Sequence, residues 1–157
     1  MKLLVFADSH NLAGNMINAA SQHLDATACF FLGDGARTAP DLQTTFPQIP
    51  LYLVQGNSDF GSFAPIDGLA PFGGLLFFYT HGHKFGVKRG PDKLCLAAQR
   101  LGADVALFGH THTPFYEQRN GVHLFCPGSI SFPQKGPPSY GIITIDNGIP
   151  AFQICYL

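Results

Sequence analysis

Charge is scarce in this chain of 157 residues: Asp, Glu, Lys and Arg together make up only 12%, and the formal net charge is −1. A nearly neutral chain has no general electrostatic attraction for nucleic acids or for anionic membrane surfaces. We therefore expect neither a long nucleic acid nor a membrane as a partner. Any affinity for phosphate has to arise from a local site.

Tryptophan, long apolar runs and paired cysteines are also missing. The opening segment MKLLVFADSH is interrupted by Asp8 and His10 before a signal peptide or a membrane-spanning helix is complete. The four cysteines form no C-x-x-C pair, which favours reduced thiols in a reducing compartment. Together these absences predict a cytoplasmic protein.

The residues that are present predict a single domain over all 157 residues, with a core rich in phenylalanine. Apolar strand patterns at 2–7, 28–32 and 51–55 alternate with helix patterns at 14–23 and 40–46. This order is typical of a βαβαβ unit.

The middle of the chain is less regular. Residues 60–74 are rich in Gly, Pro and Phe, and we expect a loop with one edge strand there, followed by a strand at 75–80. A helix is expected at 92–101 and a further strand at 105–108.

Two Asn-Gly pairs, at 120–121 and 147–148, lie between β-rich segments, and each predicts a β-hairpin. The expected fold is an α/β protein, a four-layer α/β/β/α sandwich of two mixed sheets, the second of them largely antiparallel. Helices are expected to cover both outer faces.

Five short polar motifs follow five of the apolar strand segments. They are Asp8-Ser9-His10, Gly33-Asp34, Gly56-Asn57-Ser58-Asp59, His81-Gly82-His83 and Gly109-His110-Thr111-His112. Ligands and catalytic groups collect at the carboxyl ends of strands in α/β sheets. Asp, Asn and His are oxygen and imidazole ligands that suit Mn, Fe, Zn or Ni. Asp8-Ser9-His10 alone could be a helix N-cap with an incidental histidine, but the five motifs together predict a dinuclear metal site.

The spacing within these motifs is compatible with such a site. In D-x-H and H-x-H, the two outer residues point to the same side if the chain is extended. The glycines at positions 33, 56, 82 and 109 allow close backbone approach where a strand turns into a loop.

The order D-x-H, GD, GN-x-D, HGH and GHTH resembles the calcineurin-like metallophosphoesterase superfamily over nearly the whole chain. The segments THGHKFG, FGHTHTPFYEQRNG and CPGSISFP are most similar to its small bacterial phosphodiesterases of the YfcE type. The resemblance implies the four-layer sandwich and a metal-dependent phosphodiesterase in which a hydroxide bridging two metal ions attacks a small phosphodiester. Two divalent ions are expected; Mn is the preferred candidate for both, and Fe, Zn or Ni are the alternatives.

The same resemblance implies a ligand set. It assigns Asp8, His10 and His112 to the first ion, Asn57, His81 and His110 to the second, and Asp34 to both. A bridging carboxylate can hold two cations at the separation of about 3.5–4 Å that two-metal hydrolysis requires. Asp34 and Asn57 are therefore also candidate catalytic residues.

Other residues near the motifs have two readings. His83 is a candidate catalytic and substrate-binding residue, but it could equally support a ligand or cap a turn. Arg37 is a candidate substrate-binding residue, and Lys84 and Arg89 could also contact phosphate; each could instead be a solvated loop charge. For His23 and His123, surface or pairing roles are expected.

Ser58 departs from the broad superfamily, whose members often carry histidine after the asparagine. A serine hydroxyl cannot serve as a general acid at neutral pH as an imidazole can. We expect reliance on good leaving groups or recruitment of another acid, with His83 as the first candidate. For Asp59 we expect a hydrogen bond to a ligand histidine.

Three alternatives to the phosphodiesterase remain open. A phosphomonoesterase or a nucleotide-pyrophosphate hydrolase would use the same ions, and a non-catalytic scaffold is compatible with the resemblance because a retromer subunit has this fold. The complete ligand set argues against a pure scaffold. The stretch from Phe60 to Phe72 is expected either to wall the substrate pocket or to contact a second subunit of a homo-oligomer, with core packing as the alternative.

Overall fold

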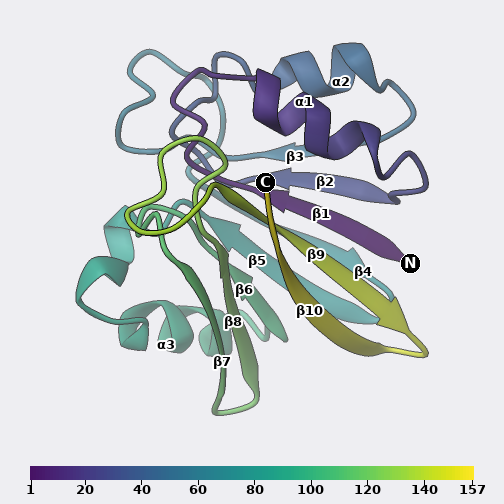
Figure 1. The fold of residues 1–157 in the computed structure, drawn as a ribbon. Coiled ribbons are helices and arrows are strands. Elements are labelled where there is room, and N and C mark those ends of the chain that lie inside the picture. The colour runs from purple at the N-terminus through teal and green to yellow at the C-terminus, as the bar shows by residue number, and fades with distance from the viewer.

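Two five-stranded β-sheets form the centre of the protein in the computed structural model, which describes residues 1–157 (Figure 1). Sheet A contains, in spatial order, β10 (Ile149–Tyr156), β9 (Ser139–Asp146), β1 (Lys2–Phe6), β2 (Ala28–Phe31) and β3 (Leu51–Leu53). Sheet B contains β4 (Asp67–Phe72), β5 (Leu75–Thr80), β6 (Val105–Leu107), β8 (Val122–Pro127) and β7 (Pro114–Arg119).

The βαβαβ start is confirmed. Strands β1, β2 and β3 are parallel neighbours, joined by α1 (Gly14–Ser21) and α2 (Pro40–Thr45). Both C-terminal hairpins are confirmed as well, since β7 pairs with β8 and β9 with β10 in antiparallel register. At both turns the Asn and the Gly have positive φ, as a type I′ turn requires.

Sheet B differs from the expectation that it would be largely antiparallel. Its outer pairs, β4 with β5 and β7 with β8, are antiparallel, but β5, β6 and β8 run parallel to one another. The helix α3 (Asp92–Arg100) joins β5 to β6 and supplies the crossover that parallel neighbours need. Because the hairpin signal at 120–121 describes only β7 and β8, it carried no information about how β8 pairs on its other edge.

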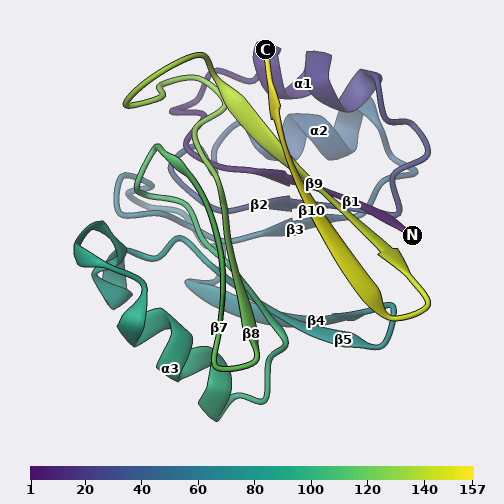
Figure 2. The same cartoon turned by 60° about the horizontal axis from the view of Figure 1, so that its bottom comes forward.

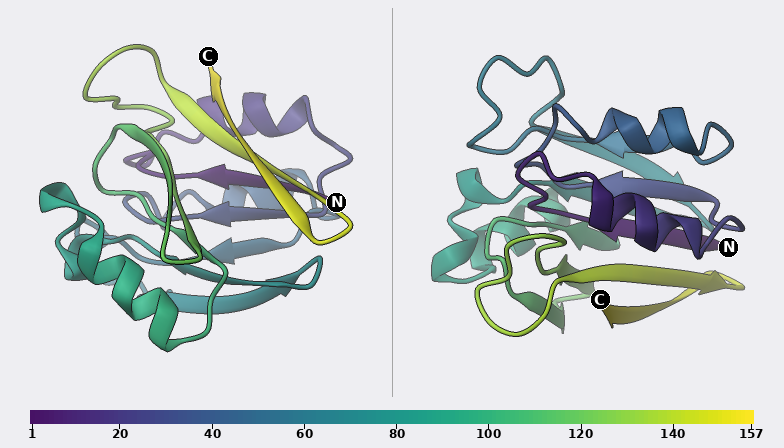
Figure 3. Two further views of the ribbon diagram at one scale, coloured as in Figure 1. Left: turned by 90° about the horizontal axis from the view of Figure 1, so that it is seen from below. Right: turned by 45° about the horizontal axis from the view of Figure 1, so that its top comes forward.

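The four layers follow from strands that are buried on both faces (Figures 2 and 3). In β1, Leu3 and Val5 face the core between the sheets, whereas Leu4 and Phe6 face the core under α1 and α2. The same alternation divides Phe77 of β5, which faces the core between the sheets, from Phe78, which faces the core under α3. Buried strands of this kind read as continuous apolar runs because successive side chains enter two different cores.

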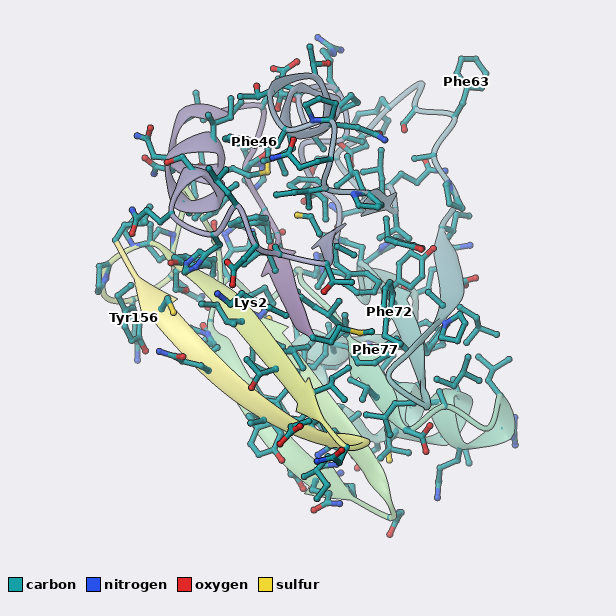
Figure 4. All side chains as sticks on the ribbon, turned by 90° about the vertical axis from the view of Figure 1, so that its right-hand side faces the viewer. Lys2, Phe46, Phe63, Phe72, Phe77 and Tyr156 are labelled. Carbon is teal, nitrogen blue, oxygen red and sulfur yellow. The ribbon has the colours of Figure 1, made fainter.

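The phenylalanine-rich stretch is divided between core and surface. Phe72 packs beside Phe77 in the core between the sheets, with ring centroids 6.0 Å apart, while Phe63 projects into solvent (Figure 4). The sequence expectation for Phe60–Phe72 is therefore wrong for Phe72. No helix of the structure is both long and apolar enough to cross a membrane.

Candidate metal centre

The loops that follow β1, β2, β3, β5 and β6 bring all seven predicted ligands to one edge of the sheets. Candidate ligand atoms form two groups, each with its members within 4.8 Å of one another. The first group is Asp8, His10, Asp34 and His112, and the second is Asp34, His81 and His110. Asp34 belongs to both groups.

The first group is centred on the buried carboxylate of Asp8. The Nε2 atom of His112 lies 3.4 Å from Asp8 Oδ1 and 3.4 Å from Nε2 of His10. The other oxygen, Asp8 Oδ2, accepts a hydrogen bond of 3.1 Å from the backbone N–H of His110. Asp8 Oδ1 is buried and has no hydrogen-bond partner.

The second group converges on the Nε2 atom of His81, which is fully buried. This atom lies 3.1 Å from Asn57 Oδ1, 3.2 Å from Nδ1 of His110 and 3.5 Å from Asp34 Oδ2. Asn57 itself is exposed, so this group opens to solvent. Asn57 Oδ1 therefore lies beside the second group.

Two backbone carbonyls fix the orientation of the histidines. The Nδ1–H of His81 donates to the carbonyl of Leu32 at 2.7 Å, and the Nδ1–H of His112 donates to the carbonyl of Phe132 at 2.5 Å. A carbonyl can only accept, so Nδ1 of each ring carries a proton and Nε2 faces the centre, where it can bind an ion once it is deprotonated. Such outer hydrogen bonds orient metal-binding histidines. Sequence analysis could not identify these carbonyls, since any residue type can supply one.

The residues fit divalent metal ions. Nitrogen and oxygen atoms bound at about 2.0–2.2 Å to one ion stand about 3–3.5 Å apart, and the nitrogen and oxygen atoms here are 3.1–3.5 Å apart. A buried carboxylate oxygen without a hydrogen-bond partner is costly unless a cation lies beside it. The donor set of carboxylate, carboxamide and imidazole suits first-row transition metals.

The predicted ligands occupy unusual backbone conformations. Eight residues other than glycine have positive φ, and five of them are predicted ligands: Asp8, His10, Asp34, His110 and His112. The chain is therefore not extended through these motifs, which was the condition under which D-x-H and H-x-H would point to one side. The side chains converge because the chain turns sharply after each strand, in a conformation that costs energy at non-glycine residues and recurs at functional sites.

Close contact between two loops explains the glycines before Asp34 and Asn57. A Cβ atom on Gly56 would lie 2.1 Å from Asp34 Oδ1, and a Cβ atom on Gly33 would lie 2.6 Å from the backbone nitrogen of Gly56. A larger residue at Gly56 would displace the carboxylate that both groups share, and a larger residue at Gly33 would displace the backbone at Gly56.

Asp59 fastens these two loops together, and the expectation of a hydrogen bond to a ligand histidine is wrong. Its carboxylate accepts hydrogen bonds of 2.8–2.9 Å from four backbone N–H groups, those of Asp34, Gly35, Ala36 and Gly56. Neighbouring Ser58 donates to both oxygens of Asp34, from its N–H at 2.8 Å and from its hydroxyl at 3.1 Å.

The two carboxylates have opposite pKa shifts. Burial raises the pKa of Asp8 to about 6, although the nearby His81 and His112 oppose this change. Burial also acts to raise the pKa of Asp34, but the hydrogen bond and charge of His81 and the hydrogen bonds of Ser58 outweigh it and hold that pKa well below its usual range.

The histidines of the second group differ from each other as well. Burial acts to lower the pKa of His81, but the hydrogen bond to Asp34 and the charge of Asp8 raise it overall. Burial together with the positive charges of His81 and Lys88 lowers the pKa of His110 to about 4. His110 is therefore a neutral imidazole at pH 7, the form that binds a metal ion.

His83 lies beside the centre but outside both ligand groups. Its ring centroid is 5.4 Å from that of His81 and 6.1 Å from that of His110, and its Nδ1 is buried without a partner. It begins a short 3-10 helix, η1 (His83–Phe85), and its side chain caps no turn there. Burial, His81 and Lys84 lower its pKa.

Two cavities flank the centre. One, of about 300 Å³, is lined by Arg37, Ser58, Asp59, Phe60 and Phe63 among others. The second, of about 490 Å³, is lined by His112 and its neighbours, together with Lys88 from the short 3-10 helix η2 (Val87–Arg89). Lys84 and Arg89 are exposed and line neither cavity. Lys88 was missed in the sequence, where it was only one of several loop cations.

The remaining histidines and Cys126 have structural partners. His23 and His123 pair with the hydroxyls of Tyr140 and Tyr116, each at 3.0 Å, as expected. Cys126 is buried in the core under α3, and its sulfur lies 3.4 Å from the hydroxyl of Thr111. Burial raises the pKa of the Cys126 thiol to about 12.

Comparison with known proteins decides the family. Residues 1–148 match the model of the calcineurin-like phosphoesterase superfamily domain. The chain belongs to this superfamily. It is therefore a metal-dependent phosphoesterase. A probable metallophosphoesterase of Bacillus subtilis, YsnB, is 33% identical over 150 residues, which cover 94% of this chain and 86% of that protein.

The phosphodiesterase YfcE of Escherichia coli is 46% identical over 70 residues, covering 44% of this chain and 34% of that protein. The structure of YfcE superposes with a TM-score of 0.71 at 26% identity, over 92% of this chain and 88% of that chain. A predicted phosphoesterase of Streptococcus pneumoniae superposes with a TM-score of 0.86 at 26% identity, over 99% of this chain and 88% of that chain.

Proposed function

We propose that this phosphoesterase binds two divalent ions, Mn²⁺ in the first place, and hydrolyses small phosphodiesters. The observation that carries the proposal is the position of Asp34 in both ligand groups. Asp8, His10 and His112 would hold one ion, Asn57, His81 and His110 the other, and Asp34 would bridge them. When bound, the two ions would supply a hydroxide nucleophile and neutralise phosphate charge in an in-line displacement.

The protein's own groups prepare this chemistry. In the metal-free protein Asp34 is ionised because His81 and Ser58 stabilise its charge, and His110 is neutral at pH 7 because its pKa is lowered to about 4. The carbonyls of Leu32 and Phe132 hold the rings of His81 and His112 with Nε2 toward the centre. These groups need little rearrangement when the substrate arrives, which is the condition for electrostatic catalysis.

The two flanking cavities support a diester rather than a monoester. A phosphodiester carries two substituents, and separate cavities adjoin the Ser58 side and the His112 side of the centre. Arg37 lines one cavity and Lys88 the other, so the lining of each cavity contains a cation. Arg37 pairs with no carboxylate in the protein, and it is our candidate for substrate binding.

His83 is our candidate for the proton donor to the leaving oxygen. Its ring lies next to His81 and His110 yet belongs to neither ligand group. Ser58 cannot perform this role, because its hydroxyl is not acidic enough near pH 7. His83→Ala should therefore slow esters with poor leaving groups more than activated aryl esters.

The test is metal analysis combined with a substrate panel. Metal-free protein is loaded with Mn²⁺, Fe²⁺, Zn²⁺ or Ni²⁺, the bound metal is counted, and hydrolysis of bis(4-nitrophenyl) phosphate, 4-nitrophenyl phosphate and a dinucleoside pyrophosphate is compared. We expect two ions per chain and the highest kcat/KM with the diester. One ion per chain, or a preference for the monoester or the pyrophosphate, would contradict the proposal.

A further inference from the structure

We infer that the cavity between Arg37 and Phe63 binds a nucleoside substituent of the phosphodiester. The inference rests on the proposed function, and it adds the class of substrate that the centre accepts. It begins from two large apolar side chains that are not buried: Phe60 is 89% exposed and Phe63, three residues further along the same loop, is fully exposed. Large apolar groups in one exposed cluster indicate a binding surface.

The loop that carries these rings is held in place at both ends. Asp59 binds four backbone N–H groups at its start, and its carbonyl accepts a hydrogen bond from the N–H of Ser62 at 3.1 Å. Gln55 binds its far end, donating from its side chain to the carbonyl of Ala64 at 2.7 Å and from its N–H to the carbonyl of Pro65 at 2.8 Å. A loop fixed in this way presents its rings without a large ordering cost on binding.

The cavity adjoins the candidate metal centre through Ser58. Ser58 lines the cavity and also donates two hydrogen bonds to Asp34. A group attached to a phosphate at the centre would therefore extend past Ser58 toward the two phenylalanines that line the same cavity. Because this continuity links the rings to the reacting phosphate, it favours a substrate substituent over a second copy of the chain.

The lining chemistry fits a nucleoside. Phe60 and Phe63 offer aromatic faces on which a base can stack. Asn11 and Ser62 add donors and acceptors for base or sugar edges, and Arg37 adds a cation that pairs with no carboxylate of this protein. At about 300 Å³ the cavity is at the lower end of small-ligand pockets, enough for one nucleoside and too small for an oligonucleotide.

The test uses two diesters with the same leaving group. Thymidine 5′-(4-nitrophenyl) phosphate and methyl 4-nitrophenyl phosphate both release 4-nitrophenolate, so their kcat/KM ratio isolates the other substituent. Stacking of a base on an aromatic side chain corresponds to roughly a 5- to 100-fold effect. We expect the Mn²⁺-loaded wild type to prefer the thymidine ester by a factor in this range, and Phe60→Ala/Phe63→Ala to reduce the preference at least about fivefold.

Two control variants separate stacking from general damage. Phe63→Tyr keeps an aromatic ring and should retain most of the preference. Tyr156→Ala removes another exposed aromatic residue, which lies on a different side of the molecule (Figure 4), and should change neither rate. Thermal melting of each variant checks that the fold is intact.

Binding provides a readout that does not depend on turnover. Calorimetric titration with thymidine 5′-monophosphate and with methyl phosphate should give tighter binding of the nucleotide, and the double variant should lose that difference. Equal rates and equal binding for the two substituents in the wild type would overturn the subsite alone. An unchanged preference in the double variant would also overturn it. If the sedimentation coefficient of that variant also fell, the two rings would instead form a contact between copies of the chain. Absence of hydrolysis with the binding preference intact would instead remove the proposed diesterase function and leave the subsite standing.

Discussion

The two halves of the candidate metal centre are held in different ways. In the half that contains Asn57 and His81, the carboxylate of Asp34, which both halves share, accepts hydrogen bonds from Ser58, and Asp59 fastens the neighbouring loops together. We call this the preformed half. In the half that contains Asp8, one carboxylate oxygen is buried without a hydrogen-bond partner.

The pKa values of Asp34 and Asp8 differ in the same way as their hydrogen bonding. The surroundings of Asp34 stabilise its charge and lower its pKa, whereas burial of Asp8 raises its pKa to about 6. The hydrogen bonds of the protein alone thus stabilise the charge of Asp34, whereas the buried charge of Asp8 lacks such partners and would be stabilised by a bound cation. A metal ion should therefore contribute more to stability in the Asp8 half, while the hydrogen bonds around Asp34 set the geometry.

The largest effect should come from removing the link between the halves. Asp34→Asn keeps the size of the side chain but replaces the charged bridging oxygen by an amide, which binds cations weakly. We expect kcat/KM for bis(4-nitrophenyl) phosphate to fall by roughly a thousandfold and at least one ion to be lost. Activity assays with elemental analysis measure both. Two bound ions together with nearly full activity would contradict the assignment.

The second-largest effect is expected from a substitution of Ser58 in the preformed half. An imidazole at this position could protonate the leaving oxygen, whereas the serine hydroxyl cannot. Because the pKa of His83 is lowered, little of its ring is protonated near pH 7, and its assistance to the leaving group is only partial. Across aryl and alkyl diesters, wild-type rates should therefore still fall steeply as the pKa of the leaving alcohol rises. Ser58→His should flatten this dependence and raise alkyl diester rates by up to about a hundredfold, the lower range of general acid catalysis.

The matched control is Ser58→Ala, which removes the hydroxyl bonded to Asp34 without adding an acid, and which should keep the steep dependence. Wild-type rates that are independent of the leaving group, with the chemical step shown to be rate-limiting, would mean that an efficient acid already exists.

Asp59→Ala should weaken the preformed half itself. Four backbone N–H groups lose their acceptor, and we expect the free energy of unfolding to fall by about 2–4 kcal/mol. Urea unfolding of the metal-free protein measures this loss. Asp41→Ala, which removes an exposed carboxylate from the first turn of α2, serves as the control. A loss below about 0.5 kcal/mol for Asp59→Ala, like that of a surface substitution, would show that the loops do not depend on this carboxylate.

Asp8→Asn should raise the free energy of unfolding of the metal-free protein, the opposite of the effect of Asp59→Ala. The pKa of Asp8 is raised from 3.8 to about 6, so its ionised form destabilises the fold above pH 6, by about 1–3 kcal/mol. The variant should therefore be more stable than the wild type at pH 7.5. The advantage should shrink as the pH falls below 6 and vanish below about 3.8, where Asp8 is protonated in both states. Equal stability at pH 7.5 would show that the buried charge is tolerated without a cation. Added Mn²⁺ should stabilise the variant less than the wild type.

Side-chain patterns in the sequence were sufficient to predict the strands, their ends and the hairpins. The apolar runs identified the buried strands, and the polar residues directly after Ala7, Gly33, Gly56, Thr80 and Gly109 marked the ends that meet at the centre. The two Asn-Gly turns fixed the hairpins because only a few residue types accept positive φ there.

Interactions through the backbone were beyond the sequence. The carbonyls of Leu32 and Phe132 and the N–H groups that bind Asp59 depend on loop geometry, not on side-chain identity. The positive φ values of Asp8 and Asp34 were hidden for the same reason. Composition likewise could not separate Phe72 in the core from Phe63 at the surface, because burial is decided by the pairing of β4 with β5.

Electron paramagnetic resonance of Mn²⁺ titrated into metal-free protein tests the bridged centre most directly. Two ions that share a carboxylate give a spin-coupled signal that differs from that of isolated Mn²⁺. We predict two ions per chain, a coupled signal at saturation, activity that rises with that signal, and loss of both in Asp34→Asn. Full activity with a single uncoupled ion per chain would contradict the account.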